Sequence, residues 1–203
     1  MRLFFLSLSL LLLTACNTLS GIDVPENFKE NLPSKAENDV PVLGQYDGYS
    51  CATTSLAMVM SFHDKKRYNA NEVWDKSGSS IHQVSRVCGN DMNGLRNAAE
   101  WAGFEKHEFI TNASVAQLKY LVSQGLPVVI NIHNFFSNNP RQYHAVVVAG
   151  YDGDQFLIRD PQGAGRSYKI SEKKLEKDWY AVLCSPRTKR ADRSMFVLYP
   201  KKA

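Results

Sequence analysis

The sequence has few cysteines, and none of them lies at the spacing that holds a metal ion. It contains four cysteines and five histidines in 203 residues, without a Cys-x-x-Cys pair. We therefore expect no metal site, and no feature of the sequence indicates an organic cofactor. Glycine and proline are also scarce, with 12 and 8 residues, while 44% of the chain is hydrophobic. These values exclude collagen-like, low-complexity and globally disordered proteins.

A strong excess of one charge is missing as well. The chain has 24 basic and 20 acidic residues, a net charge of +4, and its basic residues are scattered apart from 65–67 and a group within 187–193. A solvated surface explains both groups, so we expect no nucleic-acid partner. The composition does not define an oligomeric state.

The sequence also lacks an apolar run of the roughly 20 residues that a membrane-spanning helix needs. The apolar run at residues 3–13 follows Arg2 and is interrupted only by two serines. A positive residue followed by a short apolar run is typical of a signal peptide. The next residues, Leu-Thr-Ala ending at Cys16, resemble a bacterial lipobox, in which the cysteine is acylated and becomes the new N-terminus. We expect residues 1–15 to be a signal peptide.

An acylated Cys16 implies a membrane anchor. Several acyl chains on one cysteine anchor a protein stably, because each buried CH₂ adds ~0.8 kcal/mol. Asn17 resembles the signal that sends a Gram-negative lipoprotein to the outer membrane. We therefore expect a lipid-anchored protein of the bacterial cell envelope, which faces the periplasm if that membrane is the outer one. An ordinary secretory signal with an incidental cysteine remains the alternative.

The rest of the chain divides into a linker and one domain. Residues 16–40 are rich in Asn, Ser, Glu and Pro and carry no sustained period, which predicts a flexible tether behind the lipidated cysteine. Residues 41–203 contain no internal repeat and no second linker. They are numerous enough to bury a hydrophobic core, so we expect a single folded domain there.

Three cysteines remain if Cys16 carries lipid, and an oxidising envelope then leaves an odd thiol. The arrangement that we favour is a disulfide between Cys88 and Cys184 with Cys51 free. A disulfide that includes Cys51 stays open as the alternative.

Apolar periodicity predicts helices first and strands afterwards. Three stretches have helical spacing, and four are β-branched or continuously apolar. The predicted helices are 51–63, 93–103 and 114–124, and the predicted strands are 127–132, 144–151, 155–159 and 194–199. This order predicts an α+β domain, with N-terminal helices packed on a mainly antiparallel sheet.

Cys51 stands at the predicted start of the first helix. Free N–H groups and the helix dipole stabilise an anion there, which lowers the pKa of a thiol. A thiolate that attacks a carbonyl also needs a base, a group that orients the base, and a donor for the oxyanion. His144 opens one predicted strand and Asp160 closes the next, while Gln45 lies six residues before the cysteine. We expect these four residues to form a catalytic site.

The loop between the two strands decides whether His144 and Asp160 can meet. A three-residue loop, 152–154, places their side chains on one face of the sheet, one diagonal apart. A two-residue loop, 152–153, places them on opposite faces. A Cys-His-Asp triad therefore requires the longer loop or a β-bulge.

The order of these residues resembles that of the papain-like cysteine peptidases. The closest branch contains the bacteriocin double-glycine leader peptidases and their stand-alone relatives. Four blocks and a later tryptophan carry the resemblance over about residues 42–180: Gln45-x5-Cys51 with the following helix, Gly125–Ile130, Tyr143–Asp152, Asp160-Pro161-x-Gly163, and Trp179. It implies a papain-like fold in which Cys51 is the nucleophile, His144 is the base and Asp160 orients the imidazole. Gln45 and the Cys51 backbone N–H would form the oxyanion hole.

We therefore expect a cell-envelope thiol hydrolase, a peptidase or amidase that cleaves a peptide bond in a secreted or envelope protein or peptide. Two alternatives remain. The same residues could transfer the acyl group to an amine or thiol, as in an acyltransferase or transpeptidase. A non-catalytic lipoprotein could instead use the fold as a binding or assembly module. Ala52 favours the latter, because the family commonly has glycine after its cysteine.

Overall fold

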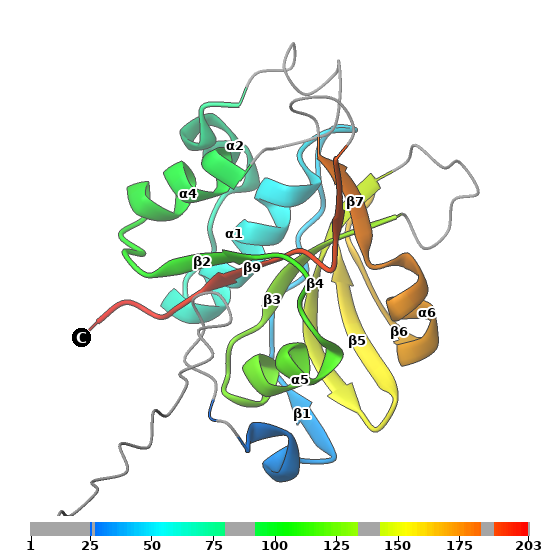
Figure 1. Cartoon of the computed structure of the whole chain (residues 1–203). Helices are drawn as coiled ribbons and strands as arrows, with labels where there is room; N and C mark the ends of the chain where they lie inside the picture. Colours follow the sequence, from blue (N-terminus) through cyan, green and yellow to red (C-terminus); the bar gives the residue numbers. More distant parts are fainter. Residues whose placement is uncertain (1–24, 26, 80–91, 134–142, 184–188, 203) are drawn as a thin grey trace, which may run out of the picture.

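The computed structural model describes residues 25, 27–79, 92–133, 143–183 and 189–202 (Figure 1). The helices are the 3-10 helix η1 (Phe28–Asn31), α1 (Cys51–Asp64), α2 (Ala70–Ser77), α4 (Met92–Trp101), α5 (Val115–Ser123) and α6 (Glu172–Asp178). The strands are β1 (Lys35–Glu37), β2 (His107–Ile110), β3 (Val128–His133), β4 (Tyr143–Asp152), β5 (Gln155–Asp160), β6 (Arg166–Ser171), β7 (Tyr180–Leu183), β8 (Lys189–Asp192) and β9 (Met195–Leu198).

One antiparallel sheet organises the described part of the chain. Its strand order is β2-β9-β3-β4-β5-β6, and β1 adds to β4, while β7 and β8 form a separate pair. Helices α1, α2 and α4 pack on one face of the large sheet, and α5 and α6 pack on the other. The predicted α+β class is confirmed, and all seven predicted elements occur within one or two residues of their expected bounds.

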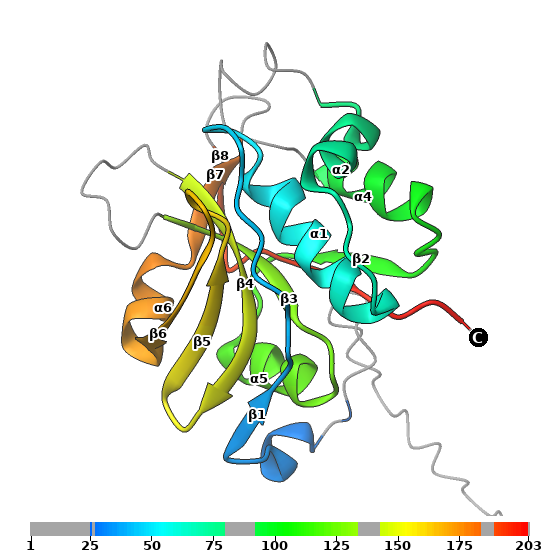
Figure 2. The same ribbon diagram turned by 180° about the vertical axis from the view of Figure 1, so that it is seen from behind.

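The predicted boundary between tether and domain is wrong for residues 28–40. These residues form η1 and β1, and β1 pairs with the end of β4, where Glu37 lies opposite Gly150. Asn38 is buried, its backbone N–H donates to Ala149 O at 2.8 Å, and its side chain donates to Val122 O at 3.0 Å. Backbone pairing holds this segment together with a few scattered apolar side chains, such as Val40 in the core and Phe28 against Tyr120. These apolar residues show no sustained period, so the largely polar sequence concealed the segment. Figure 2 shows the chain continuing from β1 along the sheet to α1.

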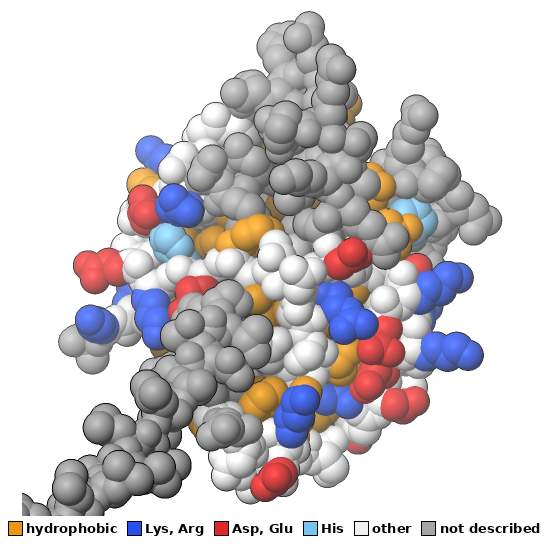
Figure 3. All heavy atoms as spheres, viewed as in Figure 1, with side chains coloured by type: hydrophobic (Ala, Val, Ile, Leu, Met, Phe, Trp, Pro, Cys, Tyr) orange, Lys and Arg blue, Asp and Glu red, His pale blue; other side chains and the backbone are white. Residues whose placement is uncertain are grey.

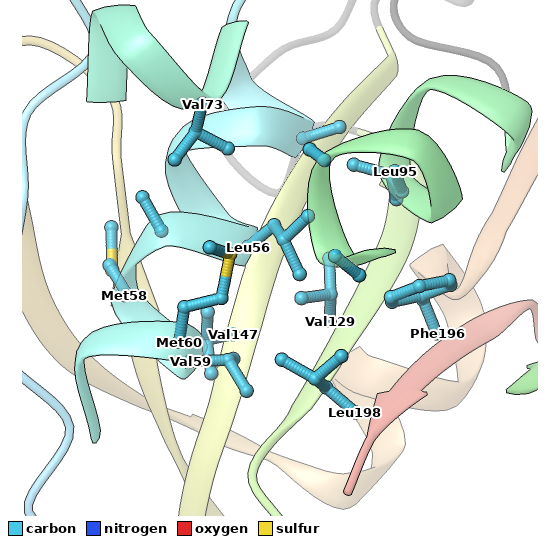
Figure 4. Close-up of a cluster of buried hydrophobic side chains, with 14 of the residues drawn as sticks. Leu56, Met58, Val59, Met60, Val73, Leu95, Val129, Val147, Phe196 and Leu198 are labelled. Carbon is cyan, nitrogen blue, oxygen red and sulfur yellow. The ribbon is translucent and has the colours of Figure 1, made fainter. Parts of the chain in front are cut away.

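Helix α1 is enclosed by the rest of the domain, since every residue from Ala52 to Ser61 is buried. Its apolar side chains pack on α2, α4 and the sheet in one cluster (Figure 4), which includes Leu56, Met58, Met60, Val73, Leu95, Val129, Val147, Phe196 and Leu198. A second cluster fills the other face of the sheet and includes Leu118, Ile130, Ile158, Leu175 and Trp179. The close packing of the first cluster fixes α1 relative to β4.

The surface is mixed in charge. On the face shown in Figure 3, basic and acidic side chains are interspersed. Among the described residues, no helix is both long enough and apolar enough to cross a bilayer.

Candidate active site

Cys51 is the first residue of α1, and the turn before it is held by an aspartate. Asp47 Oδ1 accepts hydrogen bonds from the backbone N–H groups of Tyr49 and Ser50, each at 2.7 Å. The Ser50 side chain makes no capping bond. The first turn of α1 therefore starts from a fixed loop, and Cys51 sits where free backbone N–H groups favour an anion.

The first turns of α1 contact β4 beside His144. Ser55 Oγ donates to Ala145 O at 3.2 Å, and both residues are buried. The Cys51 thiol interacts with the His144 side chain and with the backbone of Ala52 and Ala145. Cys51 is a free, half-buried cysteine. The helix start and the strand start thus bring a thiol and an imidazole into contact.

Burial and hydrogen bonding act in opposite directions on the Cys51 thiol. Burial raises its pKa, but the hydrogen bond and charge of His144, together with the two backbone N–H groups, outweigh burial and lower the pKa below the ordinary value. A lowered pKa increases the fraction of thiolate, which is the nucleophilic form of cysteine.

His144 lies between the thiol and a carboxylate. Its Nε2 is 2.6 Å from Asp160 Oδ1, which leaves Nδ1 for the Cys51 contact. Burial lowers the His144 pKa, but the hydrogen bonds and charges of Asp160 and Cys51 together raise it to about 9. The lowered pKa of Cys51 and the raised pKa of His144 both favour the thiolate–imidazolium form of the pair, and the two groups titrate together.

Asp160 is almost fully enclosed, with 1% of the residue exposed. Burial raises its pKa, but the His144 hydrogen bond and charge and the other donors lower it to about 2. The donors other than His144 are the Gln162 backbone N–H at 2.8 Å, the Arg166 guanidinium at 2.9 and 3.0 Å, and the Tyr168 hydroxyl at 2.9 Å. The carboxylate stays ionised although it is buried.

The register of β4 and β5 brings His144 and Asp160 together by a β-bulge. Asp152 pairs with Gln155, so the connecting turn consists of residues 153–154. This turn differs from both loops expected from the sequence, 152–154 and 152–153. That turn alone would put the two side chains on opposite faces. The register then shifts between Val148 and Gly150, after which Val147 pairs with Arg159. One extra residue in β4 thus restores the shared face.

Gln45 lies on the loop that leads to Cys51. Its side-chain Nε2 donates to Asp47 O at 2.5 Å, and its Oε1 is buried without a hydrogen-bond partner. Among the described residues, no hydrogen bond joins the Gln45 side chain to Cys51 or His144. The amide carries two N–H donors, and the Asp47 carbonyl uses one of them.

The segment that carries Gln45 packs directly on the loop after Asp160. The Gln45 backbone N–H donates to Pro161 O at 2.7 Å. At the preceding Gly44, a Cβ atom would lie only 2.6 Å from Gly163 O, so no side chain fits there. Backbone contact therefore couples the position of Gln45 to the position of Asp160.

Ala52 does not face a substrate groove. The residue is 4% exposed and belongs to the cluster between α1 and the sheet. Its methyl group therefore packs in the core.

Three cysteines lie outside the described residues, namely Cys16, Cys88 and Cys184. The lipid site and the disulfide remain predictions. Within the described ranges, no group of three or more His, Cys, Asp or Glu side chains is arranged to hold a metal ion.

The sequence did not identify Arg166 and Tyr168 as partners of Asp160. Strand β6 exposes three of its six residues, and Tyr168 and Ile170 are its only apolar residues, so its short alternation gives a weak strand signal. The available signal was the turn containing Gly163 and Gly165, both with positive φ, directly after a predicted strand. A hairpin there places Arg166 opposite Asp160, as found.

The sequence and the fold were compared with known proteins. The model of the Peptidase_C39 like family matches residues 37–185. The chain is similar to a C39-like peptidase from Bacillus anthracis, with 19% identity, a TM-score of 0.60, and coverage of 83% of this chain and 99% of that one. It is also similar to the peptidase domain of Streptococcus ComA, a bi-functional ABC transporter, with 20% identity, a TM-score of 0.57, and coverage of 79% and 98%.

A third structure, the cysteine protease xylellain from Xylella fastidiosa, has 14% identity, a TM-score of 0.57, and coverage of 90% of this chain and 92% of that one. At these identities the likeness concerns the fold, and the predicted papain-like peptidase fold is confirmed. A comparison with curated proteins gives no match.

Proposed function

Because this chain belongs to the Peptidase_C39 like family and is a cysteine peptidase-like enzyme, we propose that Cys51, His144 and Asp160 are its catalytic triad. The observation that carries the proposal is the continuous contact from the Cys51 sulfur through the His144 ring to the Asp160 carboxylate. The raised His144 pKa, about 9, supports a thiolate–imidazolium pair at neutral pH.

The reaction follows from these states. The Cys51 thiolate attacks the carbonyl carbon of a peptide bond, and the π electrons move to the oxygen to give a tetrahedral oxyanion. The His144 imidazolium gives its proton to the leaving amine as the C–N bond breaks, which leaves a thioester on Cys51. Water then attacks the thioester while His144 takes its proton. The carboxylic acid product leaves, and the thiolate–imidazolium pair is restored.

We assign two donors to the oxyanion. One is the backbone N–H of Cys51, which lies at the helix start and has no partner within the helix. The other is the second N–H of the Gln45 amide, whose first N–H is held by the Asp47 carbonyl. Holding one end of the amide fixes the direction of the other end, which is the preorganisation that such a donor needs.

We also propose that the enzyme is a lipoprotein of the cell envelope and acts on peptides or proteins there. The lipobox-like residues that end at Cys16 support this location. The similar domain of ComA is part of an ABC transporter, whereas here the domain follows a signal-like sequence, which favours a substrate outside the cytoplasm. Cys16→Ala is expected to move the protein from the membrane fraction to the soluble fraction, and unchanged fractionation would contradict the anchor.

The triad is tested by two measurements on the same protein. Iodoacetamide labelling followed over pH should modify Cys51 at pH values below those at which an ordinary thiol of pKa ~8.5 ionises. A peptide mixture prepared from envelope proteins should gain new termini with the wild-type protein and none with Cys51→Ala, a variant of nearly unchanged shape.

Each negative result has a defined meaning. If Cys51 reacts as an ordinary thiol and the peptide mixture is unchanged, the chain is a non-catalytic module. If peptides become joined to an added amine instead of being hydrolysed, the same triad acts as an acyltransferase. His144→Ala should slow labelling near neutral pH, because it removes the positive charge that stabilises the thiolate.

A further inference from the structure

The two oxygens of Asp160 have separate sets of donors. Oδ1 accepts from His144 Nε2 at 2.6 Å and from the Gln162 backbone N–H at 2.8 Å. Oδ2 accepts from the Tyr168 hydroxyl at 2.9 Å and from Arg166 Nε at 3.0 Å, with a second guanidinium nitrogen at 2.9 Å. Orienting an imidazole requires only the first oxygen. The donors on the second oxygen therefore need a different explanation.

Strand β6 delivers both side chains to the same carboxylate. Arg166 lies directly opposite Asp160 in the β5–β6 pairing, and Tyr168 lies opposite Ile158, two residues earlier on β5. These positions share one face of the sheet. The Arg166 guanidinium lies over the Tyr168 ring at 5.4 Å and also donates to Gln162 Oε1 at 2.6 Å. The donors are thus fixed relative to each other as well as to Asp160.

The two donors differ in character. Tyr168 is partly buried, and burial together with the Asp160 charge raises the pKa of its hydroxyl far above the usual range, so it stays protonated and can only donate to this carboxylate. Arg166 carries a permanent positive charge and exposes 41% of its side chain. Tyr168 supplies a directional bond inside the protein, and Arg166 supplies charge from the rim.

We infer that Arg166 and Tyr168 are positioning residues of this site, which hold the Asp160 carboxylate ionised and in one orientation so that His144 stays protonated beside the Cys51 thiolate. The inference rests on the proposed triad and extends it by a third layer of residues. Neither side chain needs to touch the substrate, because each acts through Asp160.

Removing either donor has a consequence for the ion pair. An oxygen of a buried carboxylate that loses its donor favours protonation or rotation, and both weaken the negative charge that His144 experiences. The groups that face Asp160 are His144 from β4, Arg166 and Tyr168 from β6, and the Gln162 N–H from the loop. Cys51 faces His144 from α1. The upper pH limit of the thiolate–imidazolium pair should therefore fall when β6 is altered.

The test is the rate of Cys51 alkylation by iodoacetamide as a function of pH, which needs no peptide substrate. In the wild-type protein the rate should change near pH 9, where His144 loses its proton. Tyr168→Phe and Arg166→Gln should move that inflection down by about one pH unit, the size expected for a lost charge-assisted hydrogen bond. Arg166→Lys keeps the positive charge, so its inflection should stay close to the wild-type pH.

Tyr151→Phe is the matched control. It also removes a tyrosine hydroxyl bond, to Pro33 O at 2.9 Å, but at the end of β4 that is far from His144 in the strand. Its inflection should stay at the wild-type pH.

An unshifted inflection in both Tyr168→Phe and Arg166→Gln, or an equal shift in Tyr151→Phe, overturns the inference and leaves the triad intact. If the wild-type protein has no inflection and Cys51 behaves as an ordinary thiol, the triad itself fails. Thermal melts identify any variant that does not fold. If Tyr168→Phe does not fold, the inference is tested by Arg166→Gln alone, because Arg166 is partly exposed.

Discussion

Gly44→Ala should impair catalysis through a backbone contact, although residue 44 carries no functional side chain. A Cβ atom at this position would lie 2.6 Å from both Gly163 O and the carbonyl carbon of Ala164. Both atoms belong to the backbone of the loop after Asp160, so neither can move aside as a flexible side chain would. The added methyl must therefore displace the segment that carries Gln45 or the loop that follows Asp160.

The size of the effect follows from the distances. Ordinary contact begins at 3.4 Å, so a Cβ at 2.6 Å requires a displacement of 0.8 Å (3.4 − 2.6). Overpacking of this kind costs about 1–3 kcal/mol of stability. A misplacement of about 1 Å in a catalytic group costs roughly 10²-fold in rate. We expect kcat/KM for a cleaved peptide to fall by about 10- to 100-fold, because the shift would move Gln45, the proposed oxyanion donor, out of position.

The assay compares hydrolysis with alkylation in the same variant. Alkylation of Cys51 by iodoacetamide forms no oxyanion, so its rate should change much less than the rate of peptide cleavage. Gly48→Ala is the control, since Gly48 lies in the same loop between Gln45 and Cys51 and a Cβ there meets nothing within 4 Å. Equal cleavage rates in the two folded variants would refute the reasoning. Equal losses of cleavage and alkylation in Gly44→Ala would show that the loop after Asp160 moves instead of Gln45.

Two further predictions concern stability. Leu56→Ala should lower the free energy of unfolding in urea by about 2–5 kcal/mol, because the side chain is fully buried on α1 and its removal leaves a cavity; a loss below 1 kcal/mol would mean that the core collapses around it. Asp160 has its pKa lowered from 3.8 to about 2 in the folded protein, so its contribution is complete above pH 3.8 and is lost as the pH falls through about 2. The difference in unfolding free energy between the wild-type protein and Asp160→Asn should shrink over that interval, and a constant difference would be inconsistent with this shift.

The residues of the proposed triad could be selected from the sequence because each stands at an element boundary with a clear local signal. The apolar spacing after Cys51 predicts α1, and the continuous apolar run after His144 predicts β4. Asp160 ends a short strand that is preceded and followed by residues typical of turns. Helix start, strand start and strand end are local properties, so they can be recognised without knowledge of the tertiary structure.

Arg166 and Tyr168, the positioning residues that we infer for the site, could not be predicted in the same way. Strand β6 and helix α6 carry few buried side chains, with Leu175 and Asp178 the buried residues of α6, and their sequences match a solvated loop as well as a regular element. Arg166 and Tyr168 acquire a role only when β6 pairs with β5. Pairing between strands is a tertiary property, and exposed strands leave little trace of it in the hydrophobic pattern.

The alignment of His144 with Asp160 depends on a part of the chain that the sequence assigned to a tether. The two-residue turn after Asp152 gives the wrong parity, and only the irregularity at Ala149 corrects it. The Ala149 carbonyl accepts the Asn38 N–H, and β1 pairs next to it at Gly150, where a Cβ would lie 2.7 Å from Ala36 O. The Asn38 N–H therefore satisfies the carbonyl at the bulge, and the close approach of β1 leaves no room for a side chain at Gly150. The residue that satisfies the bulge, Asn38, lies more than a hundred positions earlier in the chain, so the sequences of β4 and β5 do not by themselves predict the register.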